Sequence, residues 1–252
     1  MMNPDYFQFA ILIWLALAGV VFVALFFVRA PYGRHMRSGW GPGFSNTLGW
    51  ILMETPSVLI FAGMFLWGER VSNAVAWAFF SFWQAHYVHR SWIFPFKLHK
   101  RKSSLPLLVL LMGVAFNAVN ASTNGYYLFF IAPLRGALYF ADLRFVVGAL
   151  LFFGGMFLNV KSDYTLLKLR CAGSEYSIPS TGFFKWVSCP NYLGEIIEWT
   201  GWAILTWSSA GLAFAVWTAV NLGHRAYANH KWYKERFPDY PTERKALIPY
   251  LG

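Results

Sequence analysis

The stretch Asn191-Tyr192-Leu193-Gly194-Glu195-Ile196-Ile197-Glu198-Trp199 sets two carboxylates at the start of a long apolar segment. In a helix, Asn191, Glu195 and Glu198 fall at i, i+4 and i+7, so the three polar side chains share one face. Carboxylates at the edge of a hydrocarbon layer are costly unless they pair or line a wet cavity. The stretch therefore predicts a membrane helix with a functional polar face, although acids at a helix start are also favoured by the helix dipole alone.

The composition is far more apolar than a soluble chain of this length needs. Of the 252 residues, 57% are hydrophobic, 20% are aromatic and only 13% are charged, which indicates an integral membrane protein. The net charge of +10 comes from basic residues in short loops, a pattern typical of membrane orientation rather than of a nucleic-acid surface. We therefore expect no nucleic-acid partner. The two cysteines are too few for a disulfide framework, and no metal site is expected.

Seven apolar segments each reach the roughly 20 residues that a spanning helix requires. If the N-terminus is outside, only Arg70, Arg135 and Arg144 of the 21 basic residues lie in outer loops. This bias sets the orientation and supports an odd number of spans. We predict an all-α seven-transmembrane helix bundle, a single domain over residues 1–252, with the N-terminus outside and the C-terminus cytosolic. The predicted spans are 6–28, 46–67, 72–95, 105–130, 144–162, 191–208 and 211–230.

Polar residues converge on the inner half of this predicted bundle. Glu54 lies about eight residues, or roughly 12 Å, past the inner end of its span, and Tyr87 reaches nearly the same depth in the next span. Asn159, Asp163 and Arg170 end the fifth span on the side where the sixth begins. Each residue has a structural alternative: Tyr87 could be an interfacial aromatic, and Asn159 with Asp163 could bridge helices. Their convergence favours a functional site, because independent structural uses would scatter over both ends.

The predicted constellation suits two kinds of ligand. Acids, amides and arginines at the inner rim suit a polar cofactor that enters from the inner side, and the deeper apolar end suits a lipophilic substrate from the bilayer. A buried phenol beside a carboxyl group is a plausible proton donor towards a carbonyl oxygen. The sequence has no Rossmann fingerprint, no P-loop and no HExxH motif.

Several motifs together resemble one membrane family. They are Glu54-Thr55-Pro56-Ser57, His86-Tyr87-Val88-His89-Arg90, Asn159-Val160-Lys161-Ser162-Asp163-Tyr164, the 191–199 stretch, Asp239-Tyr240-Pro241 and Arg244-Lys245-Ala246-Leu247-Ile248-Pro249. With these motifs the chain closely resembles the membrane steroid 5α-reductases, over nearly everything after the first span. Single motifs also resemble sterol reductases and isoprenylcysteine methyltransferases, but the contexts of Glu54 and Tyr87 are those of the 5α-reductases.

The resemblance implies an NADPH-dependent reduction of the 4,5 double bond in a 3-oxo-4-ene steroid. By motif, Glu54 and Tyr87 would hold the C3 carbonyl oxygen while hydride reaches C5. Two departures from the family pattern, Ser177 for an arginine and Asn229 for a histidine, fall where diphosphate and adenosine contacts are expected. The residues that match the family's cofactor positions are Asn159, Asp163, Arg170, Tyr176, Asn191, Glu195, Glu198, Arg225, Tyr233 and, as a looser match, Arg101.

Two other classes compete with the reductase interpretation. A membrane methyltransferase that uses S-adenosylmethionine would share the character of the C-terminal half, but it gives no reason for Glu54 and Tyr87 to lie at equal depth. A seven-span receptor or retinal pump would need a lysine in its last span, and Asn221-Leu222-Gly223-His224 offers none. We expect a multi-pass protein of a bacterial inner membrane or the endoplasmic reticulum, with its active site open to the cytosolic side, lipid and steroid as partners, and no obligate protein partner.

Overall fold

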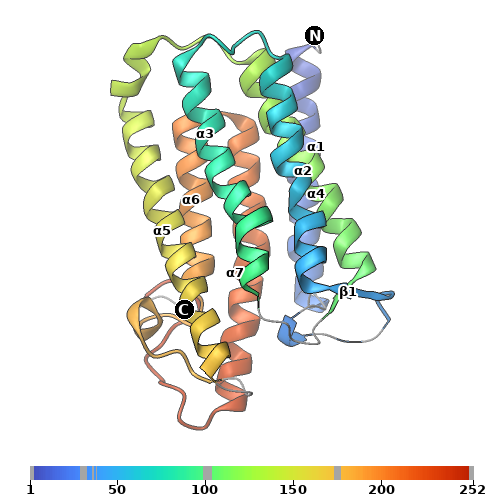
Figure 1. Cartoon of the computed structure of the whole chain (residues 1–252), viewed down its shortest axis with the longest axis vertical. Coiled ribbons are helices and arrows are strands. Elements are labelled where there is room, and N and C mark those ends of the chain that lie inside the picture. Colours follow the sequence, from blue (N-terminus) through green and yellow to red (C-terminus); the bar gives the residue numbers. More distant parts are fainter. Residues whose placement is uncertain are drawn as a thin grey trace.

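Long apolar segments form the helices of the computed structural model, which describes residues 3–28, 33–35, 37, 39–98, 104–172 and 177–249. Each of the seven predicted spans is a helix in this structure, and neighbouring helices run up and down the bundle (Figure 1). The long helices are α1 (Pro4–Phe27), α2 (Asn46–Trp67), α3 (Ala74–Val88), α4 (Leu107–Tyr126), α5 (Leu143–Ala172), α6 (Pro190–Thr206) and α7 (Ser209–Arg236).

Shorter elements extend or join these helices. The π-helical turn η2 (His89–Ile93) and the 3-10 turn η3 (Phe94–Lys97) continue α3, and the π-helical turn η4 (Tyr127–Ile131) continues α4. A short antiparallel pair joins β1 (Gly43–Ser45) to β2 (Ser104–Pro106), with Phe44 opposite Leu105. The remaining turns are η1 (Gly33–His35), η5 (Ala137–Ala141) and η6 (Gly182–Lys185).

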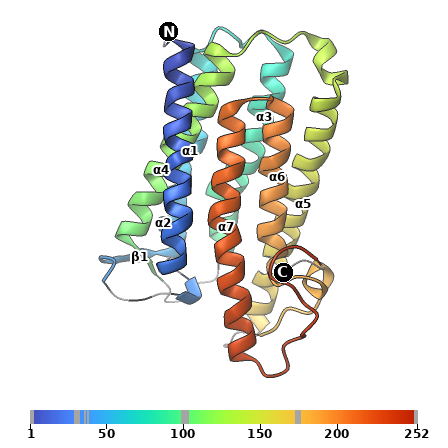
Figure 2. The same ribbon diagram turned by 180° about the vertical axis from the view of Figure 1, so that it is seen from behind.

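The two ends of the bundle differ in their connections. The N-terminus and the C-terminal segment lie at opposite ends, and the strand pair, η6 and the C-terminal segment all gather at the end away from the N-terminus (Figures 1 and 2). We call the end that carries the strand pair the inner end and the opposite one the outer end. Figure 2 shows α7 between α1 on one side and α6 on the other.

Two helices run beyond the ends predicted from apolarity. Helix α5 continues from the predicted end at 162 to Ala172, and α7 continues from 230 to Arg236. The length of an apolar segment predicts only the part of a helix that can lie in a bilayer. The helix itself can continue through polar sequence until a glycine or proline ends it. Gly173 follows α5 in the sequence and Pro238 follows the end of α7 closely.

Four of the described helices are long and apolar enough to cross a membrane. They cover Pro4–Phe27, Asn46–Trp67, Leu107–Ile131 and Leu143–Leu169. Large apolar side chains face outward on several helices, including Phe27, Trp67 and Leu138, each more than 80% exposed. Such surfaces suit lipid and not water. The structure is therefore mostly helical, as predicted, apart from the short strand pair. The count of seven spans and their orientation stay predictions, because α3 and α6 are short and α7 ends in polar sequence.

Aromatic rings fill the core between the helices. Phe61 of α2 stacks on Trp83 of α3 with ring centroids 4.4 Å apart and an interplanar angle of 9°. Trp199 and Trp202 of α6 lie in the same cluster, together with Phe214 of α7. Such rings each remove a large apolar area from solvent, so this cluster fixes α2, α3, α6 and α7 against one another.

Helices α5 and α6 approach each other unusually closely through glycines spaced seven residues apart. Gly148 and Gly155 lie on α5, and Gly194 and Gly201 lie on α6. A Cβ atom built at any of these four positions would overlap the backbone of the facing helix. Small residues of this kind let helix backbones touch inside a membrane. The close pairing places residues of α5 beside the polar face of α6.

Candidate active site

A deep polar cluster joins α2, α3 and α4. Glu54 Oε2 accepts a hydrogen bond from Asn117 Nδ2 at 3.1 Å, and the same amide nitrogen donates to the carbonyl of Met53 at 2.8 Å. Ser57 Oγ donates to Asn117 Oδ1 at 3.0 Å. The buried Tyr87 hydroxyl contacts the Ser57 side chain. Glu54 and Tyr87 are therefore linked through Ser57 and Asn117.

The position of Tyr87 follows from how α3 docks onto α2. One turn before Tyr87, Trp83 Nε1 donates to the carbonyl of Ser57 at 2.9 Å, and Gln84 Nε2 donates to the carbonyl of Val58 at 3.0 Å. Both acceptors follow Pro56, whose missing N–H removes the helical hydrogen bond to the carbonyl of Leu52 and not those to Ser57 or Val58. Side chains of α3 thus bind the backbone of α2 at the level where Glu54 and Ser57 face inward, and Tyr87 is 3% exposed.

A second cluster, which we call the rim cluster, joins η2, α5 and α6. Arg90 Nη1 donates to Asp163 Oδ2 at 2.8 Å, and Arg90 Nη2 lies 3.7 Å from Glu195 Oε2. Asn191 Nδ2 donates to Asp163 Oδ1 at 2.9 Å. Asn159 Nδ2 donates to the carbonyl of Asn191 at 3.0 Å and to Glu195 Oε2 at 3.2 Å. The four residues predicted at the α5–α6 junction are thus neighbours, with Arg90 as their cation.

Glu198 occupies a different environment from Glu195, although the two share a face of α6. Glu198 is fully buried, and its Oε1 lies 2.7 Å from His86 Nδ1. Its Oε2 has no hydrogen-bond partner among the described residues. The His86 ring also packs against Trp199, with centroids 4.6 Å apart. This pair therefore fixes α3 against α6 immediately beside Tyr87, and it leaves one buried acceptor oxygen available.

The predicted residues of α7 lie near the inner end. Arg225 Nε donates to the Tyr192 hydroxyl at 2.7 Å. Asn229, which stands where the family pattern has a histidine, is buried, and its Oδ1 lies 3.1 Å from His35 Nε2. Asn229 also reaches the Tyr192 hydroxyl at 3.5 Å. These contacts place Arg225 and Asn229 around Tyr192, one residue after the predicted contact Asn191.

The C-terminal segment closes over this end of α7. Tyr233 stacks on Tyr240 with centroids 5.3 Å apart and an angle of 12°. The Tyr240 hydroxyl and His230 Nδ1 each lie 2.6 Å from Ser188 Oγ. Burial raises the pKa of Tyr240, and the hydrogen bond to Ser188 partly opposes that effect. Arg244 fixes the same segment by donating to the carbonyl of Pro179 at 2.9 Å.

The structure brings most of the predicted site residues together but does not describe all of them. Arg101 and Tyr176 lie outside the described residues, and Arg170 is described only as backbone in α5. The other predicted residues form the deep cluster, the rim cluster, the Glu198 pair and the α7 contacts. The predicted site residues do not include His86, Asn117, Asn120 or Arg90, although His86 and Arg90 belong to one of the motifs that carry the family resemblance. Asn117 and Asn120 had a usable signal, since amides inside an apolar segment need partners.

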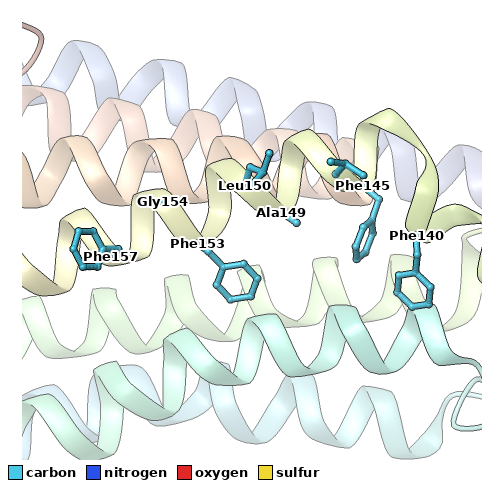
Figure 3. Close-up of a pocket in the computed structure, with 8 residues that line it drawn as sticks. Phe140, Phe145, Ala149, Leu150, Phe153, Gly154 and Phe157 are labelled. Atoms are coloured by element: carbon cyan, nitrogen blue, oxygen red, sulfur yellow. The ribbon is translucent and has the colours of Figure 1, made fainter.

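A separate hollow of about 580 Å³ lies along α5 and η5, where Phe140 and Phe153 extend towards α3 (Figure 3). Its lining is apolar: Phe140, Phe145, Val146, Ala149, Leu150, Phe153, Gly154 and Phe157. Phe153 meets Phe82 of α3, with centroids 4.6 Å apart. The hollow contains none of the polar groups described above, so it is a surface feature of α5 and not the candidate site.

Fold and site together define a helical membrane protein whose acids, amides and tyrosines meet inside the inner half of the bundle. Comparison with known families specifies the class further. The family model described as 3-oxo-5-alpha-steroid 4-dehydrogenase matches residues 103–251. This chain belongs to that family of steroid 5α-reductases, which are oxidoreductases, and the resemblance of its motifs is thereby confirmed.

Curated relatives match the chain along nearly its whole length. Steroid 5-alpha-reductase DET2 of Arabidopsis thaliana is 37% identical over 99% of this chain and 98% of that protein. The protein of the same name from Solanum lycopersicum is 39% identical over the same shares. 3-Oxo-5-alpha-steroid 4-dehydrogenase 2 of Rattus norvegicus is 41% identical over 88% of both chains. Together with the four apolar helices, these relatives identify an integral membrane protein.

Proposed function

We propose that this protein uses NADPH to reduce the 4,5 double bond of 3-oxo-4-ene steroids to 5α-3-oxosteroids. The names of its relatives support the steroid substrate and the reaction type. The observation that carries the proposal is the deep cluster, in which Glu54 and Tyr87 are linked through Ser57 and Asn117. A carboxyl group and a phenol held around one buried point suit a single oxygen atom between them.

In this proposal, Tyr87 and Glu54 act on the C3 carbonyl oxygen of the steroid. Addition of hydride at C5 moves negative charge onto that oxygen, and the resulting enolate takes up a proton from water at C4 to give the ketone. The Tyr87 hydroxyl donates a hydrogen bond to the oxygen, and Glu54 in its acid form donates a second. Donors that are already in place stabilise charge most where it develops, so they lower the barrier more than they favour binding of the ground state.

The rim cluster and its surroundings fit a nicotinamide dinucleotide. When bound, the reduced nicotinamide supplies the hydride. Arg90 and Arg225 offer guanidinium donors, and Asn159, Asn191 and Glu195 offer amide and carboxylate groups of the kind that bind ribose and carboxamide. The buried Glu198 Oε2 is an acceptor that the described protein leaves without a donor, and an amide N–H would satisfy it. Asp163, Tyr233, Arg170, Tyr176 and Arg101 complete the proposed set.

The proposal also assigns the two routes into the site. The cofactor enters at the inner end, which we assign to the cytosolic side, because that end carries the arginines, amides and C-terminal segment. The steroid enters from the bilayer, because the aromatic core around Tyr87 is apolar and the helices expose apolar surface to lipid. The membrane is a bacterial inner membrane or the endoplasmic reticulum.

Product analysis with labelled cofactor tests the proposed reaction. Purified protein is incubated with a 3-oxo-4-ene steroid and NADPH that carries deuterium at the reactive C4 position. We expect a 5α-3-oxosteroid with deuterium at C5. A parallel titration with S-adenosylmethionine should show no saturable binding. Saturable binding of S-adenosylmethionine with no reduced steroid would overturn the proposal in favour of the methyltransferase.

A further inference from the structure

Helix α4 carries a row of three buried asparagines within an apolar segment. Asn117, Asn120 and Asn124 fall at i, i+3 and i+7, and their exposed fractions are 5%, 1% and 0%. An amide inside a membrane bundle is costly unless its donors and acceptors are paired. The partners of Asn117 include Glu54, as described above, so the question is what the other two amides bind.

The orientation of these two amides is set by a tryptophan. Trp202 Nε1 donates to Asn124 Oδ1 at 2.9 Å. Because an indole nitrogen can only donate, Asn124 must present its oxygen to Trp202 and its NH₂ group in the other direction. Asn124 Nδ2 donates to Asn120 Oδ1 at 3.1 Å. Asn120 therefore presents its oxygen to Asn124, which turns its NH₂ group towards another partner.

The Asn120 side chain lies beside the phenol of Tyr87. Asn120 Nδ2 is buried and has no hydrogen-bond partner within the part of the chain that the structure describes. The Tyr87 hydroxyl contacts the side chains of Ser57 and Asn120. Ser57 already donates its own proton to Asn117 Oδ1, so it can receive a hydrogen bond from Tyr87. The observed donors thus run in one direction, from Trp202 to Asn124 and from Asn124 to Asn120, and they end at an Asn120 NH₂ group beside the Tyr87 side chain.

We infer that Asn120 is a positioning residue that donates to the Tyr87 oxygen and directs the phenolic proton towards the substrate carbonyl. This inference rests on the proposed reductase function. If the Tyr87 oxygen accepts a hydrogen bond from Asn120, the Tyr87 O–H bond points to the opposite side. There it donates to Ser57 Oγ in the absence of substrate, and to the steroid carbonyl oxygen when the substrate is bound. Hydrogen bonds in such a chain polarise one another, so Tyr87 becomes a stronger donor to the charge that develops on the steroid oxygen.

Replacing Asn120 by leucine removes the donor and keeps a side chain of similar size. We expect kcat for the steroid to fall roughly tenfold, as the loss of one hydrogen bond in a low-dielectric site predicts. The KM for the steroid and the affinity for NADPH should stay within about twofold, because Asn120 acts through Tyr87 on the transition state. Thr206→Val removes a buried hydroxyl that donates to the carbonyl of Trp202 and should leave kcat unchanged.

A double-mutant cycle separates this role from plain helix packing. In the Tyr87→Phe background, Asn120→Leu should have no further effect on kcat, because its target oxygen is absent. An equal loss of kcat in both backgrounds, or wild-type kcat in the single variant, would overturn the inference while the proposed function stands. If Asn120→Leu does not fold, Asn120→Ser keeps a polar group for Asn124 but is too short to reach Tyr87, and the same results apply. Wild-type protein that reduces no steroid would overturn the proposed function and this inference with it.

Discussion

Two ion pairs, one at the outer end of the bundle and one in the inner half, are built in different ways. At the outer end, Asp142 and Arg144 are two positions apart in the sequence, and their side chains are 27% and 43% exposed. In the inner half, Arg90 and Asp163 are 73 positions apart and come from different helices, with side chains 13% and 11% exposed. The outer pair depends on local sequence alone. The inner pair exists only when η2, which continues α3, and α5 have packed, so it is a product of the fold.

The difference predicts where substitutions matter. An exposed ion pair gains little, because water and salt screen it and two side chains must be ordered. Breaking a buried pair leaves a charge without a partner in a poorly solvated place, which is strongly destabilising even where the intact pair adds little. Substitutions in the inner half should also affect function more than those at the outer end. Buried donors and acceptors with fixed orientation can stabilise charge that develops on a substrate.

The largest effect is expected from Arg90→Met, which leaves Asp163 and Glu195 without their cation. Loss of one partner from a buried ion pair costs about 3–5 kcal/mol of the free energy of unfolding. We expect a large drop in melting temperature in detergent and weaker NADPH binding. Lys231→Met is the matched control, because Lys231 pairs with Glu235 at 3.8 Å on an exposed surface. Equal losses in both variants would show that burial does not separate the two kinds of pair.

Tyr87→Phe should have the next largest effect, on turnover and not on folding. The variant removes one donor to the developing oxygen charge, which typically lowers kcat by roughly a hundredfold or more. Glu54→Gln keeps a hydrogen-bonding group of the same size but supplies no acid proton, so it should also lower kcat. If the two act on one oxygen, the double variant should cost far less than the product of the single losses.

Melting temperatures of the same preparations provide the control for Tyr87 and Glu54. The competing interpretation makes Tyr87 an interfacial anchor and Glu54 a helix-packing group, in which case stability would fall before activity. Near-normal steroid turnover in Tyr87→Phe would rule out a catalytic role for Tyr87. The deep cluster would then be a polar network that only holds the helices together.

Two adjacent glycines of α5 allow a test of packing at the level of the site. A Cβ atom at Gly155 would overlap the backbone nitrogen of Glu198, whereas a Cβ atom at Gly154 would meet nothing within 4 Å. Gly155→Ala should therefore force α5 and α6 apart and cost about 1–3 kcal/mol. Gly154→Ala should be neutral or slightly stabilising, because alanine favours helix more than glycine does. If the Gly155→Ala and Gly154→Ala variants had the same melting temperature, α5 and α6 could not be in close contact at Gly155.

The sequence predicted the helices well because apolar length is a local property. It predicted the common depth of Glu54 and Tyr87 by counting residues along two helices, and the structure places both in one cluster. The motifs that carried the family resemblance are likewise contiguous, and the family model and the curated relatives confirm that resemblance. The roles assigned to the site residues stay predictions, since they concern ligands.

The sequence could not predict pairs that depend on how helices rotate about their axes. His86 and Glu198 are 112 positions apart, and nothing in either local sequence indicates that α3 and α6 turn these side chains towards each other. The spacing of Glu195 and Glu198 places both on one face of α6 and predicts one common site. In the structure Glu198 lies about one helical turn deeper, so it pairs with His86, whereas Glu195 lies near Arg90. The seven-residue spacing of glycines in α5 and α6, by contrast, was a readable signal of close packing.

The smallest effect is expected from Asp142→Asn at the outer end. The pKa of Asp142 is lowered from 3.8 to about 2, because Arg144 donates hydrogen bonds to it from both its side chain and its backbone. A carboxyl group whose pKa is lower in the folded state stabilises that state above its unfolded pKa, and this contribution is lost as the pH falls through the folded pKa. Any difference in melting temperature between wild type and Asp142→Asn should therefore be small at pH 7, because the pair is exposed. It should shrink further as the pH is lowered from about 4 towards 2. A loss at pH 7 as large as that of Arg90→Met, or one that grows on acidification, would mean that the outer pair is coupled to the fold in the way we assign only to the inner half.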